Sequence, residues 1–172
     1  MDTPAFKELL SRFMTAAEAG DGEAFARCFT EDAIYHDYVY GDHQGRADIA
    51  HMMSDLFHRD AGNDYRWEMF DPICEGDLAY AWSLSAFTST VPEFAGQRVV
   101  IDGMSRFELQ GGLIRDYRES VNGGVAMAQL GVHPERLAKV CAKWGRQLVA
   151  MPETAEFLAR DKGSPKGGGG SD

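Results

Sequence analysis

Apolar residues in the first sixty positions recur at helical spacing in three runs. The first run follows Thr3-Pro4, which reads as a cap and first helical turn, and it ends at Gly20 with an apolar face of Phe6, Leu9, Leu10, Phe13, Met14 and Ala17. A short second helix follows Asp21-Gly22, and a third begins near Arg46 and carries Ile49, Met52, Met53, Leu56 and Phe57. Between them, residues 33–37 predict a brief strand and residues 41–45 a polar turn.

From Tyr65 to Val121 the pattern changes to strands and turns. Tyr65, Trp67 and Met69 alternate with polar residues, and Glu75-Gly76-Asp77 predicts a turn into a strand over residues 78–88. Gln110-Gly111-Gly112 is a tight connection between strands over residues 98–109 and 113–121, as in an antiparallel hairpin. Helices followed by a bent antiparallel sheet predict an α+β domain.

Beyond Gly123-Gly124 the pattern becomes helical again. Its apolar stripe is Leu137, Val140, Cys141, Trp144 and Leu148, and Pro152 starts another segment to Arg160. We expect a domain over residues 1–124, a C-terminal helical extension over 125–162 and a flexible Gly/Ser tail over 163–172. The stripe is expected to pack on the domain or on a partner subunit, with an active-site lid as the alternative.

The charge of the chain excludes several classes of partner. Its 172 residues include 27 acidic and 17 basic ones, and the net charge of -10 repels nucleic acid and anionic membrane surfaces. No apolar run approaches the roughly 20 residues of a membrane span, and the first residues lack the pattern of a signal peptide, so we expect a cytoplasmic protein. The cysteines Cys28, Cys74 and Cys141 are too scattered for a disulfide framework or a paired-cysteine metal site.

Four short segments, in this order and spacing, resemble a known family. They are Ala19-Gly20-Asp21, the stretch from Thr30 to Asp37, Gly45-Arg46-Ala47-Asp48-Ile49, and the stretch from Gly112 to Glu119. Together they resemble the SnoaL-like branch of the nuclear-transport-factor-2-like superfamily, which includes polyketide cyclases, ketosteroid isomerases, limonene epoxide hydrolases and cofactorless lyases of aromatic compounds. The resemblance implies a cone-shaped α+β barrel, with three N-terminal helices packed on a curved antiparallel sheet and a mouth that admits an apolar small molecule.

The resemblance also implies two candidate carboxylates. Asp37 falls where ketosteroid isomerases carry their general base, and burial in an apolar cone would raise its pKa toward working pH. Glu119, which shares strand parity with Tyr117, matches the position where epoxide hydrolases place a water-activating acid. The alternatives are that Asp37 caps a turn and that Glu119 forms an ion pair at the rim. His36 has the opposite parity to Asp37, so it reaches the cone only if the strand bulges.

Two departures from the family pattern narrow the chemistry. The oxyanion-hole tyrosine of the isomerases falls at Phe13, and their protonated aspartate falls near Gly103, beside an Asp102 that we expect to be exposed. The Arg and Asp pair of the epoxide hydrolases would lie in residues 78–86, which are apolar and aromatic here. Steroid isomerisation and epoxide hydrolysis are therefore disfavoured.

Aromatic and imidazole side chains complete the expected site. Tyr35 joins Asp37, Glu119, Tyr117 and His36 as a catalytic candidate, and Tyr80 and Trp82 are expected to face inward with Leu84. The expected substrate-binding residues are Trp67, Tyr80, Trp82, His51, Met53 and Phe13. Nine rings with polar tips are costly to bury without partners, so as a group they favour an aromatic pocket over a plain core, and several are expected to line one cavity: Tyr35, Tyr38, Tyr40, His43, His51, Trp67, Tyr80, Trp82 and Tyr117. His36, Asp37, His43 and His51 match no standard metal-ligand spacing, and the chain has no dinucleotide fingerprint.

The sequence thus predicts a cofactor-independent lyase or isomerase, needing no metal, that acts on a hydrophobic aromatic small molecule. A buried carboxylate base would remove a proton, and tyrosine or histidine hydrogen bonds would stabilise the resulting negative charge. The alternatives are a polyketide cyclase or dehydratase, and a non-catalytic binding or assembly module. A homodimer or other small homo-oligomer is expected, because Val100 and Met104 on the outer sheet face must be buried somewhere.

Overall fold

The computed structural model describes residues 1–37 and 39–161, which fall into two compact units. The first unit ends at Val132 and the second begins at His133. The helices of the first unit are α1 (Thr3–Ala19), α2 (Gly22–Ala26), α3 (Arg46–His51), the π-helical turn η1 (Met52–Phe57), α4 (His58–Ala61), the 3-10 turn η2 (Pro92–Phe94) and α5 (Gly123–Gln129). Its strands are β1 (Phe29–Asp37), β2 (Gly41–Gln44), β3 (Arg66–Glu75), β4 (Leu78–Thr88), β5 (Arg98–Gln110) and β6 (Leu113–Val121).

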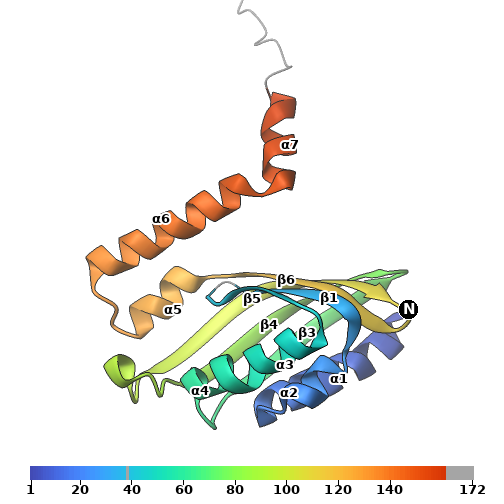
Figure 1. Ribbon diagram of the computed structural model, residues 1–172, viewed down its shortest axis with the longest axis horizontal. Coiled ribbons are helices and arrows are strands. Elements are labelled where there is room, and N and C mark those ends of the chain that lie inside the picture. The colour runs from blue at the N-terminus through green and yellow to red at the C-terminus, as the bar shows by residue number, and fades with distance from the viewer. Residues whose placement is uncertain (38, 162–172) are drawn as a thin grey trace, which may run out of the picture. The chain divides into compact units, whose positions relative to one another are not determined.

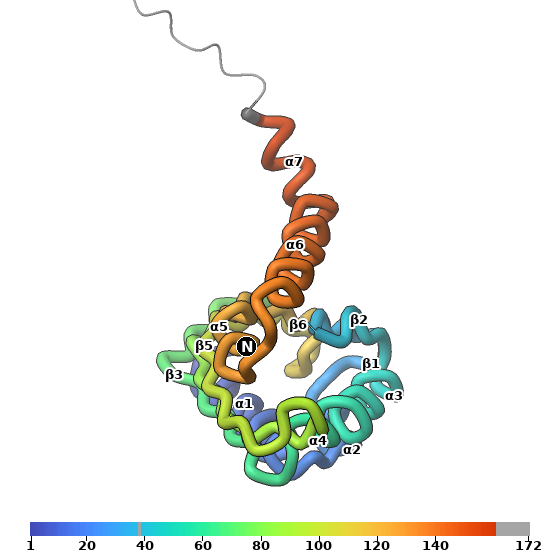
Figure 2. Tube along the Cα trace, turned by 90° about the vertical axis from the view of Figure 1, so that its left-hand side faces the viewer, coloured from blue at the N-terminus to red at the C-terminus, as the bar shows by residue number. Residues whose placement is uncertain are grey.

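The six strands form one sheet in the order β2-β1-β6-β5-β4-β3. All neighbours are antiparallel except β1 and β6, which run parallel. Helices α1 to α4 cover one face of this sheet (Figure 1), and in the end-on view the sheet curls around them without closing (Figure 2). The predicted α+β cone, with helices packed on a curved sheet, is confirmed.

Helix α1 fills the concave side of the sheet. Asp2 caps it by accepting a hydrogen bond from the backbone N–H of Ala5 at 2.9 Å, and Gly20 ends it in the left-handed conformation that glycine favours. Its buried face is Phe6, Leu9, Leu10, Phe13, Ala16 and Ala17. Phe13 packs against Trp67 of β3 at 4.9 Å and against Tyr117 of β6 at 5.6 Å between ring centroids. The core therefore lies between this helix and the inner sheet face.

The chain between α2 and α3 differs from the sequence prediction. Strand β1 begins at Phe29, four residues earlier than expected, and residues 41–44 form strand β2 where a polar turn was predicted. The side chain of Asp37 explains the reversal, because it accepts hydrogen bonds from the backbone N–H groups of Val39 and Tyr40 and so turns the chain back against β1. The predicted third helix is present as α3, η1 and α4 in succession.

Strand β4 faces the opposite way to our prediction. Ala79, Ala81 and Ser83 are buried on the concave face, whereas Tyr80 and Trp82 are 40% and 41% exposed on the outer face. The expectation that Tyr80 and Trp82 line the cone is therefore wrong. The reason is space: the rings of α1 and β3 already occupy the concave side, so only small residues fit beneath them. Trp82 instead packs on Phe70 of β3, with ring centroids 4.9 Å apart.

Helix α5 belongs to the first unit, which extends past the expected boundary at residue 124. The side-chain amide of Gln129 accepts from the backbone N–H of Val100 at 3.0 Å and donates to its carbonyl at 2.8 Å. The backbone N–H and C=O groups of Val100 lie beyond Gly103, where the pairing of β5 with β6 ends, and Gln129 supplies their hydrogen-bond partners. The same bonds attach helix α5 to the sheet.

The second unit consists of helices α6 (Pro134–Ala150) and α7 (Pro152–Asp161). His133 caps α6 by accepting a hydrogen bond from the backbone N–H of Glu135, and Pro134 occupies its first turn. The predicted apolar stripe lies on α6, where no residue is buried. The predicted Gly/Ser tail, and Tyr38 of the expected rings, lie outside the described residues. In the described parts of the chain, no helix has the length and apolar character needed to cross a bilayer.

Candidate active site

Two carboxylates lie level with each other on the inner face of neighbouring strands. The parallel register pairs Tyr35 of β1 with Tyr117 of β6, so Asp37 and Glu119, two residues further along each strand, share that face. The register between β5 and β6 places Ser105 opposite Glu119. Alternation along β6 thus brings Tyr117 and Glu119 together, as the sequence predicted.

The hydroxyl of Tyr117 connects Glu119 to Ser105. It lies 3.0 Å from Oε2 of Glu119 and 3.0 Å from Oγ of Ser105, and the whole Tyr117 side chain is buried. Because a phenol has one proton, Tyr117 donates it to Glu119 and accepts the proton of Ser105. This chain of hydrogen bonds fixes the direction of the carboxylate.

Glu119 has an unusual proton affinity for a carboxyl group. Burial, and next the negative charge of Asp37, raise the pKa of Glu119 from 4.5 to about 7, while the hydrogen bond from Tyr117 acts against them. Both protonation states are therefore populated near neutral pH. This is the condition under which a side chain both takes and returns protons efficiently.

Asp37 acts as a turn cap and as an inner-face carboxylate at once. Its Oδ1 accepts hydrogen bonds from the backbone N–H groups of Val39 at 2.6 Å and Tyr40 at 2.7 Å. Burial raises the pKa of Asp37, and these two N–H groups and the charge of His43 oppose the rise. The turn cap that the sequence left as the alternative is therefore present, and the same carboxyl group also lies on the inner face of the cone.

Aromatic rings surround the carboxylates. Tyr35 stacks on Tyr117 with centroids 4.6 Å apart, Trp67 packs on Phe13, and Tyr65 meets the edge of Phe57 at 4.6 Å. Burial raises the pKa of Tyr35, Tyr65 and Tyr117 well above the usual value for tyrosine. These phenols consequently stay protonated and can donate hydrogen bonds.

The turn after Asp37 is tied to helix α4. The hydroxyl of Tyr40 donates to Oδ2 of Asp60 at 2.8 Å, and the backbone N–H of Thr90 donates to the Asp60 carbonyl at 3.1 Å. The β1–β2 turn, α4 and the β4–β5 connection are thereby joined at the end of the sheet where Asp37 lies.

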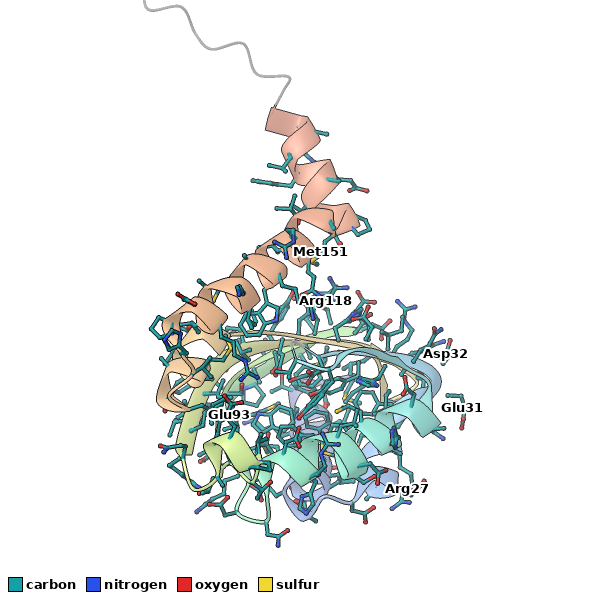
Figure 3. The ribbon with its side chains drawn as sticks, turned by 60° about the vertical axis from the view of Figure 1, so that its left-hand side comes forward. Arg27, Glu31, Asp32, Glu93, Arg118 and Met151 are labelled. Atoms are coloured by element: carbon teal, nitrogen blue, oxygen red, sulfur yellow. The ribbon has the colours of Figure 1, made fainter. Side chains whose placement is uncertain are left out.

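His36 lies on the other side of the sheet from the carboxylates. Its Nδ1 is 2.8 Å from Asp42 and its Nε2 is 3.1 Å from Asp116, and the bond to Asp116 is the main reason that the pKa of His36 is raised. Figure 3 shows Arg118, which contacts the same ring, on the face away from α1 to α4. Strand alternation thus removes His36 from the group of catalytic candidates that the structure brings together.

The predicted substrate-binding residues divide into two groups. Phe13, Met53 and Trp67 are buried in the core that surrounds the carboxylates. His51 is exposed and pairs with Asp55 at 2.9 Å, one helical turn away, and Tyr80 and Trp82 are on the outer face. Asp102 is exposed as expected. Within residues 1–37 and 39–161 no cluster of three or more His, Cys, Asp or Glu side chains could hold a metal ion.

Sequence reasoning missed two polar groups of the site, Ser105 and Tyr65, and it named His43 only among the nine rings of which several were expected to line a cavity. Ser105 and Tyr65 had a usable signal, because Ser105 has the opposite strand parity to Asp102, which was expected to be exposed, and Tyr65 shares parity with Trp67, which was expected inside. His43 had none, because its inward direction depends on strand β2, which the sequence presents as a turn.

Solved structures with the same fold have low sequence identity to this chain. A protein from Catenulispora acidiphila with a ketosteroid isomerase-like fold, solved with trimethylamine, has 15% identity and a TM-score of 0.65 over 73% of this chain and 94% of its own. TsrD from Streptomyces laurentii has 18% identity and a TM-score of 0.66, covering 77% and 99%. An epoxide hydrolase of the LEH-like type from M. tuberculosis has 15% identity and a TM-score of 0.61, covering 74% and 90%.

The family itself is identified by sequence. No curated protein matches the chain. The model of the SnoaL-like domain matches residues 10–117, a range that runs from α1 to Tyr117 and includes Tyr35 and Asp37. The protein therefore belongs to the SnoaL-like domain family.

Proposed function

We propose that this protein is a cofactor-independent acid–base enzyme that removes a proton from a hydrophobic, aromatic small molecule, with Glu119 as the general base. One observation carries the proposal: a partly buried carboxyl group, held by Tyr117, has its pKa raised to about 7 on the inner face of the cone. Carboxyl groups with such a pKa are typical of proton-transferring sites.

Glu119 suits the role of base better than Asp37, which the resemblance to ketosteroid isomerases favoured. Oδ1 of Asp37 already accepts two backbone hydrogen bonds, and these reduce its affinity for a proton. The negative charge of Asp37 instead makes Glu119 more basic. Asp37 thus acts as a charged neighbour that also shapes the turn.

The surrounding rings suit the substrate class and the charge that develops in the reaction. Proton removal beside a carbonyl places negative charge on oxygen, and neutral tyrosine hydroxyls such as those of Tyr35 and Tyr65 can stabilise it. Isomerisation, carbon–carbon cleavage and cyclisation or dehydration of a polyketide all include this step. We favour lyase or isomerase chemistry, with a polyketide cyclase or dehydratase as the alternative.

The step can be measured without knowing the natural substrate. Aromatic ketones with an acidic C–H bond would be incubated with the protein in D₂O, and loss of the C–H signal would be followed by proton NMR. The rate of exchange should fall about 100-fold or more in Glu119→Gln. Glu108→Gln is the matched control, because Glu108 lies on the outer face and pairs with Arg106 and Arg115.

Two results would contradict this assignment. Exchange that survives in Glu119→Gln but is lost in Asp37→Asn would make Asp37 the base. Exchange that is equal in both variants and the wild type, or undetectable for all of them, would favour a non-catalytic binding module.

A further inference from the structure

A histidine–carboxylate pair lies near Asp37, one of the two carboxylates of the site. Nδ1 of His43, on β2, is 3.1 Å from Oδ1 of Asp48, and Oδ2 of Asp48 accepts the backbone N–H of Gln44 at 3.0 Å. The hydrogen bond with His43 is the main reason that the pKa of Asp48 is lowered, so this carboxylate is ionised and can only accept. Nδ1 must therefore carry a proton, and in the neutral ring the lone pair is on Nε2.

Nε2 of His43 is buried and has no hydrogen-bond partner among the described residues. Only 7% of His43 is exposed. Buried polar atoms are almost always hydrogen-bonded, so a buried basic nitrogen without a protein partner marks a place for a ligand or a water molecule.

The sheet register places this nitrogen on the same face as the candidate active site. His43 pairs directly with Tyr35, and residues directly opposite in an antiparallel pair share a face. That face also carries Asp37 on β1, whose carboxyl group is close enough to be affected by the charge of His43. Tyr35 in turn stacks on Tyr117, which holds Glu119. The groups facing His43 are thus Asp48 from α3, and Tyr35 and Asp37 from β1.

We propose that His43 is a second catalytic residue of this site, whose Nε2 contacts the substrate while Asp48 fixes its tautomer. The inference rests on the proposed function for its catalytic part. With His43 protonated and Glu119 ionised, Glu119 takes the proton from carbon, the C–H electron pair forms the new C=C bond and the C=O π pair moves onto the oxygen. The oxygen takes the Nε2 proton, which leaves His43 as the neutral Nδ1–H tautomer that Asp48 fixes. Return of the proton from Glu119 to a carbon, and of the hydroxyl proton to Nε2, completes an isomerisation and restores both groups.

The contact can be tested by binding alone, with 4-chlorophenol as the probe. Its hydroxyl group can donate to a neutral Nε2, and its ring suits an aromatic site. In ¹⁵N-histidine-labelled wild-type protein we expect the Nδ1–H tautomer of His43, and we expect the probe to shift the Nε2 resonance. His43→Gln should bind the probe about tenfold more weakly by calorimetry, as for loss of one hydrogen bond. His58→Gln is the matched control, since Nδ1 of His58 is also buried without a hydrogen-bond partner among the described residues but lies against Gly20.

The variant Asp48→Asn keeps the imidazole ring of His43 but changes its tautomer, so it tests the effect of the tautomer alone. The asparagine amide can donate to Nδ1, so the spectrum should change to the Nε2–H tautomer and the affinity for the phenol should fall as in His43→Gln. An unchanged Nε2 resonance at saturating probe, a probe that does not bind, or full affinity in His43→Gln would each overturn the proposal.

The outcome for His43 is distinguishable from the outcome for the proposed function. If Glu119→Gln loses hydrogen exchange while His43→Gln keeps the wild-type rate, only the role of His43 is wrong. If Glu119→Gln retains full exchange, the proposed base is wrong, while the contact between the phenol and Nε2 remains measurable in the same protein.

Discussion

Tyr117 donates its phenolic proton to Glu119 across 3.0 Å, from two positions earlier on the same strand. The two side chains share the inner face of β6, and Ser105 on the neighbouring strand completes the chain at 3.0 Å. Tyr117 is fully buried, and its bond opposes the rise in the pKa of Glu119 that burial and the charge of Asp37 cause.

Tyr117→Phe should raise the pKa of Glu119 above its value of about 7, because the bond from Tyr117 stabilises the ionised form. Phenylalanine keeps the ring packing, so the fold should remain. The measurement is a pH titration of the Glu119 carboxyl carbon by NMR. Ser105→Ala, which keeps the Tyr117–Glu119 bond, should change the pKa less, and a fall in the pKa of Glu119 in Tyr117→Phe would contradict the assignment.

Asp37→Asn should shift the same titration in the opposite direction. Removing the negative charge of Asp37 removes the second-largest cause of the raised pKa, so Glu119 should titrate at lower pH. The asparagine side-chain oxygen can still accept from Val39 and Tyr40, which preserves the turn. Because the base must be ionised, the rise of exchange activity with pH should move to lower pH as well. An unchanged titration would mean that the two carboxylates are not coupled.

Strand alternation explains both what the sequence predicted and where it failed. On β1 and β6, alternation placed Tyr35, Asp37, Tyr117 and Glu119 on one face, and the structure brings them together. On β4, alternation shows that Tyr80 and Trp82 share a face, but it does not show which face is concave. Both faces of β4 carry apolar residues, so the choice depends on how much room α1 and β3 leave, which is a tertiary property.

The position of His43 could not be predicted for a different physical reason. Strand β2 has four residues, of which three are polar or charged and one is glycine, so its composition is that of a turn. Its strand geometry comes from pairing with β1 after the turn that Asp37 caps. Only that pairing sets the inward direction of the imidazole.

Folding stability should fall as pH rises from about 4.5 to about 7, because of Glu119. In this range the unfolded chain releases the Glu119 proton while the folded protein keeps it, so rising pH favours unfolding. Below this range Glu119 is protonated in the folded and the unfolded protein, so it has no effect on stability. Above this range the full loss of folding stability is reached, on the order of 3 kcal/mol.

Glu119→Gln isolates this contribution from other titrating groups. The free energy of unfolding of wild type and variant would be measured by urea denaturation across this range. As pH rises, the free energy of unfolding of the wild type should fall relative to that of Glu119→Gln. A difference that stays constant with pH would show that Glu119 titrates normally in the folded protein.

The outer face of the sheet leads to the last prediction, a homodimer. Met104 and Trp82 are adjacent across β4 and β5, and Phe70 lies next to Trp82 on β3, so these three side chains form an apolar row across the outer face. Met104 is 50% exposed and Trp82 41%, so this row is accessible, and Val100, which is 48% exposed, lies on the same face beyond the exposed Asp102. Apolar surfaces of this kind commonly mark an interface, and we propose that a second copy of the chain covers it through a twofold contact.

Light scattering at micromolar concentration should then give twice the chain mass. Met104→Glu and Trp82→Glu should each give a monomer, because a twofold contact would bring every introduced charge near its own copy in an apolar interface. Val39→Glu, which places the same charge at an exposed apolar residue away from the sheet, should leave the dimer intact. A wild-type monomer would refute the prediction, and a dimer that persists in both sheet variants would move the interface to another surface.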